Sequence, residues 1–237
     1  MTDSYVCVDL ETTGLNPKKD RIIEIGVVKV ENNVVVEEWG TFVNPGRQLD
    51  ERVVELTGIQ DRQLEQAPSI DEALPRLLGL LDSPVLLGHS VIFDYSFIKK
   101  AAVDRRIPFE KEGIDTLKIA RKYLPELESR SLEYLCRHYG ISHRAHRALC
   151  DARATVELYQ KLVEQFCDKE EENVTDLFCP KKLQCHIKRE TPATIPQKEQ
   201  LYKLVDKHRL IIDYDIETLS RSEASRRIAR LLAEYGR

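Results

Sequence analysis

Two carboxylates lie two residues apart near the start of the chain, in the run Tyr5-Val6-Cys7-Val8-Asp9-Leu10-Glu11-Thr12-Thr13-Gly14-Leu15. The residues before them are apolar and β-branched, which predicts a strand, and residues i and i+2 of a strand point to the same face. Asp9 and Glu11 would then project together, and like charges held so close repel each other unless a cation lies between them. The pattern predicts a divalent metal site. A solvent-exposed strand end with two hydrated acids would give the same spacing.

Two further clusters carry the residue types that would complete such a site. His89 and Asp94 belong to the run Gly88-His89-Ser90-Val91-Ile92-Phe93-Asp94, and His146 precedes Asp151 by five residues. Each has a simpler explanation, because both acids fall near the start of an expected helix, where a carboxylate favours the helix dipole, and a single loop histidine is usual on a surface. Together, however, four acids and one histidine are the groups that two-metal phosphodiester cleavage needs.

The chemistry of these side chains indicates hydrolysis with metal ions. Carboxylate oxygens are hard ligands that suit Mg²⁺ or Mn²⁺, and two such ions about 3.5–4 Å apart stabilise the attacking and leaving oxygens of a phosphodiester. A histidine can take a proton from water at neutral pH, which makes His146 the candidate base. The sequence has no Gly-x-x-x-x-Gly-Lys loop, so nucleoside triphosphatase chemistry is unsupported.

The elements that must position these residues follow from the apolar pattern. Expected strands cover residues 4–10, 21–30, 33–43, 84–88 and 113–115, and expected helices cover 50–57, 70–82, 92–106, 115–123, 131–139 and 148–167. Asn32-Asn33 suits a tight hairpin, so the first three strands are predicted to form an antiparallel meander. The later alternation of strands and helices adds parallel strands. The prediction is an α/β fold with a mixed five-stranded sheet flanked by helices, and with Asp9 and Glu11 at the end of a central strand.

The three clusters resemble the three motifs of the DEDDh 3′→5′ exonucleases. That family includes the proofreading epsilon subunit of bacterial DNA polymerase III and the exonuclease region of the Gram-positive replicative polymerase. Thr57-Gly58-Ile59 also matches a segment often found between the first two motifs, and the resemblance covers about residues 3–167. It implies a ribonuclease H-like fold, two Mg²⁺ or Mn²⁺ ions, and removal of nucleoside 5′-monophosphates from the 3′ end of single-stranded DNA, in proofreading or repair.

The resemblance implies a role for each residue of the reaction centre. Asp9 would bridge both metal ions, Glu11 and Asp151 would complete the first metal site, and Asp94 would support the second. His146 would be the general base.

The same resemblance implies a set of substrate-binding residues, namely Thr12, Thr13, Gly14, Leu15, His89 and Phe93. The backbone around Thr12 and Thr13 would hold the terminal 3′-hydroxyl, and Leu15 would wedge against the last base. His89 and Phe93 would line the pocket for the last nucleotides. One position departs from the family, which often has Asn after the histidine of this motif. Here it is Ser90, which reaches less far.

The rest of the chain predicts a small second module. We expect an exonuclease domain over residues 1–168, a linker over 169–195 and a helical module over 196–237, with helices at 197–208 and 221–235. From residue 178 onward there are 13 Lys and Arg against 8 Asp and Glu, whereas residues 1–177 carry 23 against 32. The basic tail predicts a contact with nucleic acid or a protein partner, and a solvated helix face is the alternative. The basic residues of its two helices are Lys198, Lys203, Lys207, Arg226, Arg227 and Arg230.

Several observations predict a cytoplasmic protein without a membrane partner. No run of about 18 apolar residues exists, and the first residues lack the pattern of a signal peptide. The six cysteines are scattered, as expected of reduced thiols. A zinc site from Cys167, Cys179, Cys185 and His186 is a further alternative, although the spacing matches no standard finger.

Two alternatives to a DNA exonuclease stay open. An RNA-trimming 3′→5′ exonuclease would use the same residues, since contacts to the 2′-hydroxyl decide between the substrates. The chain could also act chiefly as a subunit that docks on a DNA polymerase through its basic tail.

Overall fold

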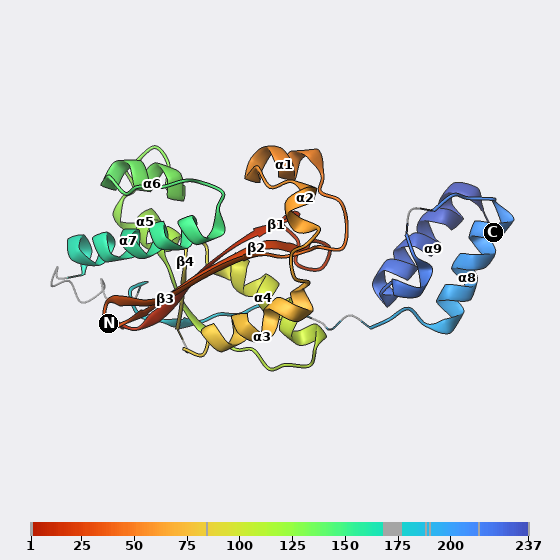
Figure 1. Cartoon of the computed structure of the whole chain (residues 1–237), viewed down its shortest axis with the longest axis horizontal. Coiled ribbons are helices and arrows are strands. Elements are labelled where there is room, and N and C mark those ends of the chain that lie inside the picture. The colour runs from red at the N-terminus through yellow and green to blue at the C-terminus, as the bar shows by residue number, and fades with distance from the viewer. Residues whose placement is uncertain are drawn as a thin grey trace. The chain divides into compact units, whose positions relative to one another are not determined.

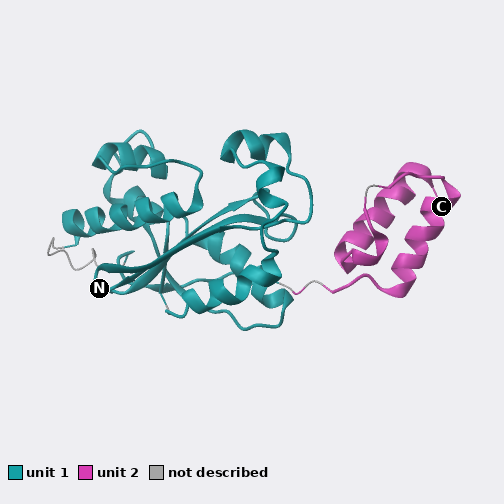
Figure 2. Ribbon diagram, viewed as in Figure 1, with its two compact units in different colours: residues 1–187 teal, residues 188–237 magenta. Residues whose placement is uncertain are grey.

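The computed structural model describes residues 2–83, 85–167, 177–187, 189, 191–212 and 214–236. The chain divides into two compact units, residues 1–187 and residues 188–237 (Figures 1 and 2). The first unit contains all of the residues that the sequence assigns to the candidate site.

A mixed six-stranded sheet forms the centre of the first unit, in the order β3-β2-β1-β4-β5-β6. The strands are β1 (Tyr5–Thr12), β2 (Ile22–Glu31), β3 (Val34–Phe42), β4 (Val85–Gly88), β5 (Glu112–Asp115) and β6 (Lys181–Lys182). The first three are antiparallel to one another, β4 and β5 run parallel to β1, and β6 is antiparallel to β5. The predicted α/β fold with a mixed sheet and a central β1 is confirmed. The sheet has one strand more than predicted, because the two residues of β6 leave no periodic pattern in the sequence.

Helices cover both faces of this sheet (Figure 1). On one face lie α5 (Thr116–Tyr123), α6 (Leu132–Tyr139) and α7 (Ala148–Phe166), and on the other lie α3 (Ile70–Leu80) and α4 (Ile92–Asp104). Two short helices, α1 (Glu51–Thr57) and α2 (Asp61–Leu64), follow β3, and α2 was not predicted. The side chains of β1 alternate between the two cores, with Tyr5 and Cys7 on the α7 side and Val6 and Val8 on the α3 and α4 side. This alternation directs Asp9 and Glu11 toward α7.

Glycine at position 26 allows α7 to approach the sheet. Gly26 pairs with Asp9 across β1 and β2, and a Cβ atom on Gly26 would lie 2.2 Å from the carbonyl carbon and oxygen of Ala148. Any side chain there would therefore overlap the backbone of the first turn of α7. The glycine lets this turn, which carries Asp151, lie directly over the pair of acids on β1.

The end of the first unit lies inside the segment that the sequence predicted as a linker. Phe178 is fully buried in the core on the α7 side, and Leu183 is buried in the core on the other side. Residues 177–187 thus pack on the first unit, and the boundary between the units falls after Ile187 rather than at residue 168. Residues 169–176 of the predicted linker lie outside the described residues.

The second unit has a small core of its own. Its elements are α8 (Ile195–Lys207), a 3-10 helix η2 (Ile216–Thr218) and α9 (Arg221–Tyr235). Thr194 and Ser220 cap α8 and α9 in reciprocal hydrogen bonds with Gln197 and Glu223, and only the box at Ser220 was predicted from the sequence. The buried side chains of its core are Ala193, Leu201, Leu204, Ile216, Leu219, Ala224 and Ile228.

The basic side chains of the second unit differ in their surroundings. Lys198 forms an ion pair of 2.6 Å with Glu217, and the guanidinium of Arg227 lies 3.5 Å from the centre of the Tyr214 ring. Arg226 and Arg230 of α9 are exposed. A role in binding nucleic acid stays a prediction for this unit.

Two further expectations concern the membrane and the cysteines. Among the helices that the structure describes, none combines the length and the apolar character needed to cross a lipid bilayer. In the same part of the chain, Cys167, Cys179, Cys185 and His186 do not gather at distances that suit a metal ion.

Candidate active site

A cavity of about 400 Å³ opens at the end of β1 and is lined by all three sequence clusters. The predicted residues that line it are Asp9, Glu11, Leu15, His89, Phe93, Asp94, His146 and Asp151. β1, the turn after β4, the start of α4 and the start of α7 therefore meet at one site. Residues separated by up to 142 positions in the sequence face the same space.

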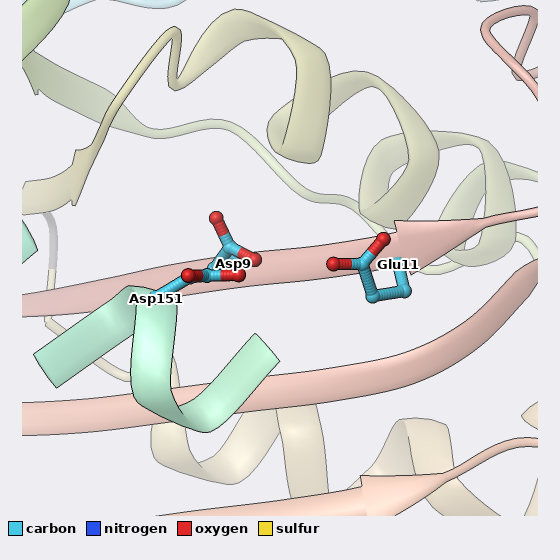
Figure 3. Close-up of side chains that lie close together, drawn as sticks. All are labelled: Asp9, Glu11 and Asp151. Atoms are coloured by element: carbon cyan, nitrogen blue, oxygen red, sulfur yellow. The ribbon is translucent and has the colours of Figure 1, made fainter. Parts of the chain in front are cut away.

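Three of the four acids form a compact cluster. Asp9 and Glu11 project from β1, and Asp151 reaches them from the first turn of α7 (Figure 3). One carboxylate oxygen of each lies within 4.8 Å of the others, a spacing that suits shared coordination of a cation. The regular pairing of β1 with β2 is interrupted between Glu11 and Thr12. Such an irregularity is frequent beside active sites, where it redirects the chain.

The fourth acid, Asp94, lies in the same cavity but outside this cluster. It is buried at the start of α4, and its Oδ1 accepts a hydrogen bond of 3.0 Å from the backbone N–H of Leu10. This bond ties α4 to the strand between the two acids of β1. Among the neighbouring charges, that of Asp94 has the largest effect on the pKa of Asp9.

The cluster is electrostatically costly when all its acids are ionised. Burial, followed by the charges of Asp94 and Asp151, raises the pKa of Asp9 well above its usual range. Burial and the charge of Asp151 raise the pKa of Glu11 to about 7, and burial raises the pKa of Asp94. Carboxylates that resist ionisation in this way are stabilised by a cation placed among them.

His146 stands at the edge of the acid cluster. Its ring is about half exposed, and its Nδ1 lies 4.0 Å from Oε1 of Glu11. The residue has a positive φ of 62°, so the backbone turns sharply just before α7 begins. This turn is what brings a loop side chain next to an acid of β1.

A second histidine, His143, was not predicted. Its buried side chain forms a hydrogen bond through Nε2 with Oδ1 of Asp151, while Oδ2 of Asp151 accepts a bond of 3.1 Å from the backbone N–H of Arg147. Asp151 is thus held by both of its oxygens, and it accepts a bond from the residue before α7 in addition to facing the cavity. The only signal in the sequence is that His143 lies three residues before His146, and loop residues have no periodicity that would place its side chain.

His89 is held by bonds to both ring nitrogens. Nδ1 pairs with the hydroxyl of Thr116 at 2.9 Å, and Nε2 lies 2.8 Å from the carbonyl oxygen of Arg130, to which it donates. Burial lowers the pKa of His89, which favours the neutral ring. The ring is therefore a fixed wall of the cavity.

Ser90 occupies a left-handed conformation, with φ of 75°. Asparagine tolerates this region better than serine does, because its side chain hydrogen-bonds locally. The backbone N–H of Ser90 donates to Oδ1 of the buried Asp115, and this bond holds the turn. The asparagine expected here from the resemblance thus fits the backbone conformation as well as the pocket.

The loop after β1 presents Leu15 to solvent. The hydroxyl of Thr12 donates to the carbonyl oxygen of Gly14 at 2.7 Å, and the hydroxyl of Thr13 accepts from the backbone N–H of Arg21 at 3.0 Å. Arg47 reaches this loop by hydrogen bonds to Thr13 and Asp20. Leu15 itself is 85% exposed, although it is apolar.

A second cavity of about 910 Å³ continues the first around this leucine. The two share Leu10, Glu11, Leu15 and Phe93, and the second extends to α1, where it is lined by Arg52, Val53 and Leu56. The site is therefore a long cleft, in which the acid cluster lies in the first cavity and Glu11 lines both cavities.

The sequence as a whole matches a known family. The profile of a family described as Exonuclease matches residues 6–159. The epsilon subunit of DNA polymerase III from Aquifex aeolicus is 34% identical over 183 residues, which are 76% of this chain and 90% of that protein. The chain belongs to this exonuclease family. The exonuclease is also 37% identical over 176 residues to the PolC-type DNA polymerase III of Clostridium perfringens, and these residues cover 74% of the chain but only 12% of that polymerase.

Solved structures share the fold of the exonuclease. Exonuclease X in complex with 5′-overhanging duplex DNA superposes with a TM-score of 0.58 at 22% identity, over 74% of this chain and 99% of that one. The zinc-bound form of E. coli exonuclease I in complex with single-stranded DNA gives 0.63 at 22% identity, over 70% and 41% of the two chains. At these identities the similarity establishes the ribonuclease H-like fold, which confirms the predicted architecture.

Proposed function

We propose that this exonuclease is a metal-dependent 3′→5′ exonuclease that removes nucleoside 5′-monophosphates from single-stranded DNA. The observation that carries the proposal is the gathering of Asp9, Glu11 and Asp151 within 4.8 Å, with His146 beside them, in a cleft that continues past Leu15 to α1.

The acids fit a hard divalent cation such as Mg²⁺ or Mn²⁺. All ligand atoms of the cluster are carboxylate oxygens, and their burial and mutual repulsion raise the pKa of Asp9 and of Glu11. Asp9, Glu11 and Asp151 would hold one ion, and Asp9 with Asp94 would support a second. When bound, the two ions supply electrostatic stabilisation of the attacking and leaving oxygens of the phosphodiester.

The protein's own groups then perform the remaining tasks. A ring nitrogen of His146 takes the proton of the attacking water, and the exposure of this ring gives the proton a path to solvent. The backbone of the Thr12–Gly14 loop holds the terminal 3′-hydroxyl. Leu15 packs against the last base and separates it from its neighbour, which explains why an apolar side chain is left 85% exposed at the cleft. The rings of His89 and Phe93 line the pocket.

Single-stranded DNA is favoured as the substrate by the relatives. The epsilon subunit of Aquifex aeolicus is part of DNA polymerase III, and E. coli exonuclease I has been solved with single-stranded DNA and with a dA16 oligonucleotide. The alternatives are an RNA-trimming enzyme and a subunit that acts chiefly by docking on a polymerase. The PolC-type relatives are polymerases that this chain covers only in part. They support a polymerase partner more directly than an RNA substrate.

A digestion experiment tests the proposal directly. Oligonucleotides labelled at the 5′ end and matched in sequence as DNA and RNA are incubated with Mg²⁺, and the products are resolved by length. We expect a ladder that shortens from the 3′ end, faster on DNA, and no ladder for Asp9→Ala or with a chelator present. Faster digestion of RNA would favour the trimming enzyme, and equal lack of activity in the wild type and in Asp9→Ala would overturn the proposal.

A further inference from the structure

A fifth acid, Glu24, lies beside the acid cluster without belonging to it. Glu24 is buried on β2 and pairs with Glu11 across the sheet, so its side chain points toward α7 as that of Glu11 does. Its charge contributes to the raised pKa of both Asp9 and Glu11. In the absence of a cation, the negative charge of Glu24 adds to the repulsion among the acids. The presence of this buried carboxylate therefore needs an explanation.

The partners of Glu24 are the residues that follow His146. Its Oε1 accepts hydrogen bonds from Nε and Nη2 of Arg147, at 3.2 and 2.9 Å, and its Oε2 accepts a bond of 3.3 Å from the backbone N–H of Ala148. Each oxygen of the carboxylate therefore has its own donors. The guanidinium of Arg147 also lies 5.1 Å from the centre of the Phe42 ring on β3, which fixes it against the sheet.

These bonds replace a missing helix cap. The N-cap residue of α7 is Arg147, and its side chain accepts no bond from the helix. The unpaired N–H groups of a first helical turn are usually satisfied by a short polar side chain at that position. Here Glu24 accepts from one of them across the sheet, while its negative charge also faces the positive end of the helix dipole.

We infer that Glu24 is a positioning residue, which uses Arg147 and Ala148 to set the sharp turn that places His146 beside Glu11. This rests on the proposed function of His146 as the base. Since His146 directly precedes Arg147 and has a left-handed backbone, the Glu24–Arg147 pair fixes the chain at the point where the turn ends. Glu24 is not a metal ligand, because its two oxygens are already occupied by donors and it lies outside the acid cluster.

The variant Glu24→Gln tests this role with little change in shape. Its amide keeps one acceptor oxygen but loses the charge and the second acceptor, so Arg147 or the helix start loses its partner. We expect kcat on a single-stranded oligonucleotide to fall by about 10- to 100-fold, because a small displacement of a reacting group costs that much. KM should stay within about threefold, since no substrate contact changes.

Glu38→Gln is the matched control. Glu38 on β3 pairs with Arg153 farther along α7, so it also joins the sheet to this helix through an arginine, but away from His146. We expect its kcat to equal that of the wild type within about twofold. A loss of kcat in Glu38→Gln as large as in Glu24→Gln would show that any loosening of α7 lowers the rate. That result would overturn the inference.

A second comparison separates positioning from structural damage. If Glu24 acts through His146, adding Glu24→Gln to a His146→Ala protein should change the residual rate by less than about twofold, because coupled residues are not additive. An equal loss in both backgrounds overturns the inference.

Hydrogen exchange gives a readout that does not depend on activity. Amides at the start of α7 should exchange faster in Glu24→Gln than in Glu38→Gln. Unchanged exchange in Glu24→Gln would refute the role of Glu24 without bearing on the proposed function. A wild-type protein without exonuclease activity would instead refute the proposed function.

Discussion

At the scale of single residues, the site is built from carboxylates held closer than their charges favour. Asp9 and Glu11 share one face of β1, and Asp151 is added from α7. Backbone N–H groups offset part of this cost, because Leu10 donates to Asp94, Arg147 to Asp151 and Ala148 to Glu24. The remaining repulsion would favour a cation placed among the acids.

The raised pKa of Glu11 predicts how stability depends on pH and metal. Glu11 has a pKa of about 7 in the folded, metal-free protein, against 4.5 as the usual value, so the folded state binds more protons than the unfolded state between these values. The free energy of unfolding contributed by this group therefore falls as pH rises from about 4.5 to about 7. Because a bound cation removes this penalty, we expect saturating Mg²⁺ or Mn²⁺ to raise Tm more at about pH 8 than at about pH 5.5.

Scanning calorimetry with and without metal measures this effect. The rise in Tm at about pH 8 should be about 5 °C or more, given about 2–4 °C per kcal/mol for a protein of this size. The variant Asp9→Asn serves as the control, since it should gain stability without metal and lose the response to metal. An equal metal-induced rise in Tm at both pH values would contradict the predicted linkage.

His146 allows the base to be separated from the metal ligands. Its Nδ1 lies 4.0 Å from Oε1 of Glu11, which is too far for a strong hydrogen bond. Among the described residues, the group with metal-ligand spacing consists of Asp9, Glu11 and Asp151 and does not include His146. We expect His146→Ala to lower kcat by about 10²- to 10⁴-fold, the usual contribution of a general base. Titration with Mn²⁺ should show nearly unchanged affinity, whereas Asp9→Ala should lose both activity and binding. Full activity of His146→Ala would exclude the base role.

At the scale of elements, the position of α7 on the sheet decides whether the acids meet. Gly26 allows the backbone of Ala148 to lie where a side chain would otherwise be, and Glu24 then caps the helix from β2. Both residues stand on β2, the strand that pairs with the two acids of β1. The antiparallel hairpin thus carries two acids of the candidate metal site on one strand, and on the other the two residues that contact the start of α7.

The substitution Gly26→Ala tests this arrangement. A Cβ atom 2.2 Å from the backbone of Ala148 forces α7 away from the sheet, because backbone atoms cannot rotate aside. We expect the free energy of unfolding to fall by about 1–3 kcal/mol, as for overpacked cores, and kcat to fall by about 10²-fold as Asp151 moves from Asp9. Thermal denaturation and digestion of single-stranded DNA measure the two effects.

Gly79→Ala is the matched control for this prediction. Gly79 lies in α3 with no atom within 4 Å of an added Cβ, and alanine favours a helix over glycine by about 0.5–1 kcal/mol. The control should therefore keep full activity and at least the wild-type Tm. Wild-type activity in Gly26→Ala would show that α7 can shift without consequence for the site.

Local pattern was enough to predict most elements and to single out the four acids and His146, but not their contacts. The two-residue period of a strand correctly directed Asp9 and Glu11 to one face, and helix-start signals placed Asp94 and Asp151. The contact of His143 with Asp151 depends on the path of a loop, and the partners of Glu24 depend on the register of β2 against α7. Such contacts join residues distant in sequence, and no periodicity within one segment encodes them.

At the scale of the whole molecule, the second unit has a hydrophobic core separate from those of the exonuclease unit. The core of the exonuclease unit takes in Phe178, whose ring lies 5.9 Å from that of Tyr123 and 6.4 Å from that of Tyr159. The second unit has its own cluster around Leu201 and Ala224. A unit with a separate core is expected to fold without the other.

Truncation at two positions tests where the exonuclease unit ends. A chain that ends after Ile187 keeps Phe178, Leu183 and β6, so we expect the Tm of its main transition and its kcat on short single-stranded DNA to match those of the full chain. A chain that ends after Cys167 loses all three, and removal of the buried phenylalanine alone should lower the free energy of unfolding by about 3–5 kcal/mol.

The point variant Phe178→Ala in the full chain should reproduce much of this loss. Leu201→Ala is the matched control, because it empties the core of the second unit and should leave the exonuclease transition unchanged. Equal stability of the two truncated chains would move the end of the unit back to residue 168 and show that residues 177–187 do not support the core.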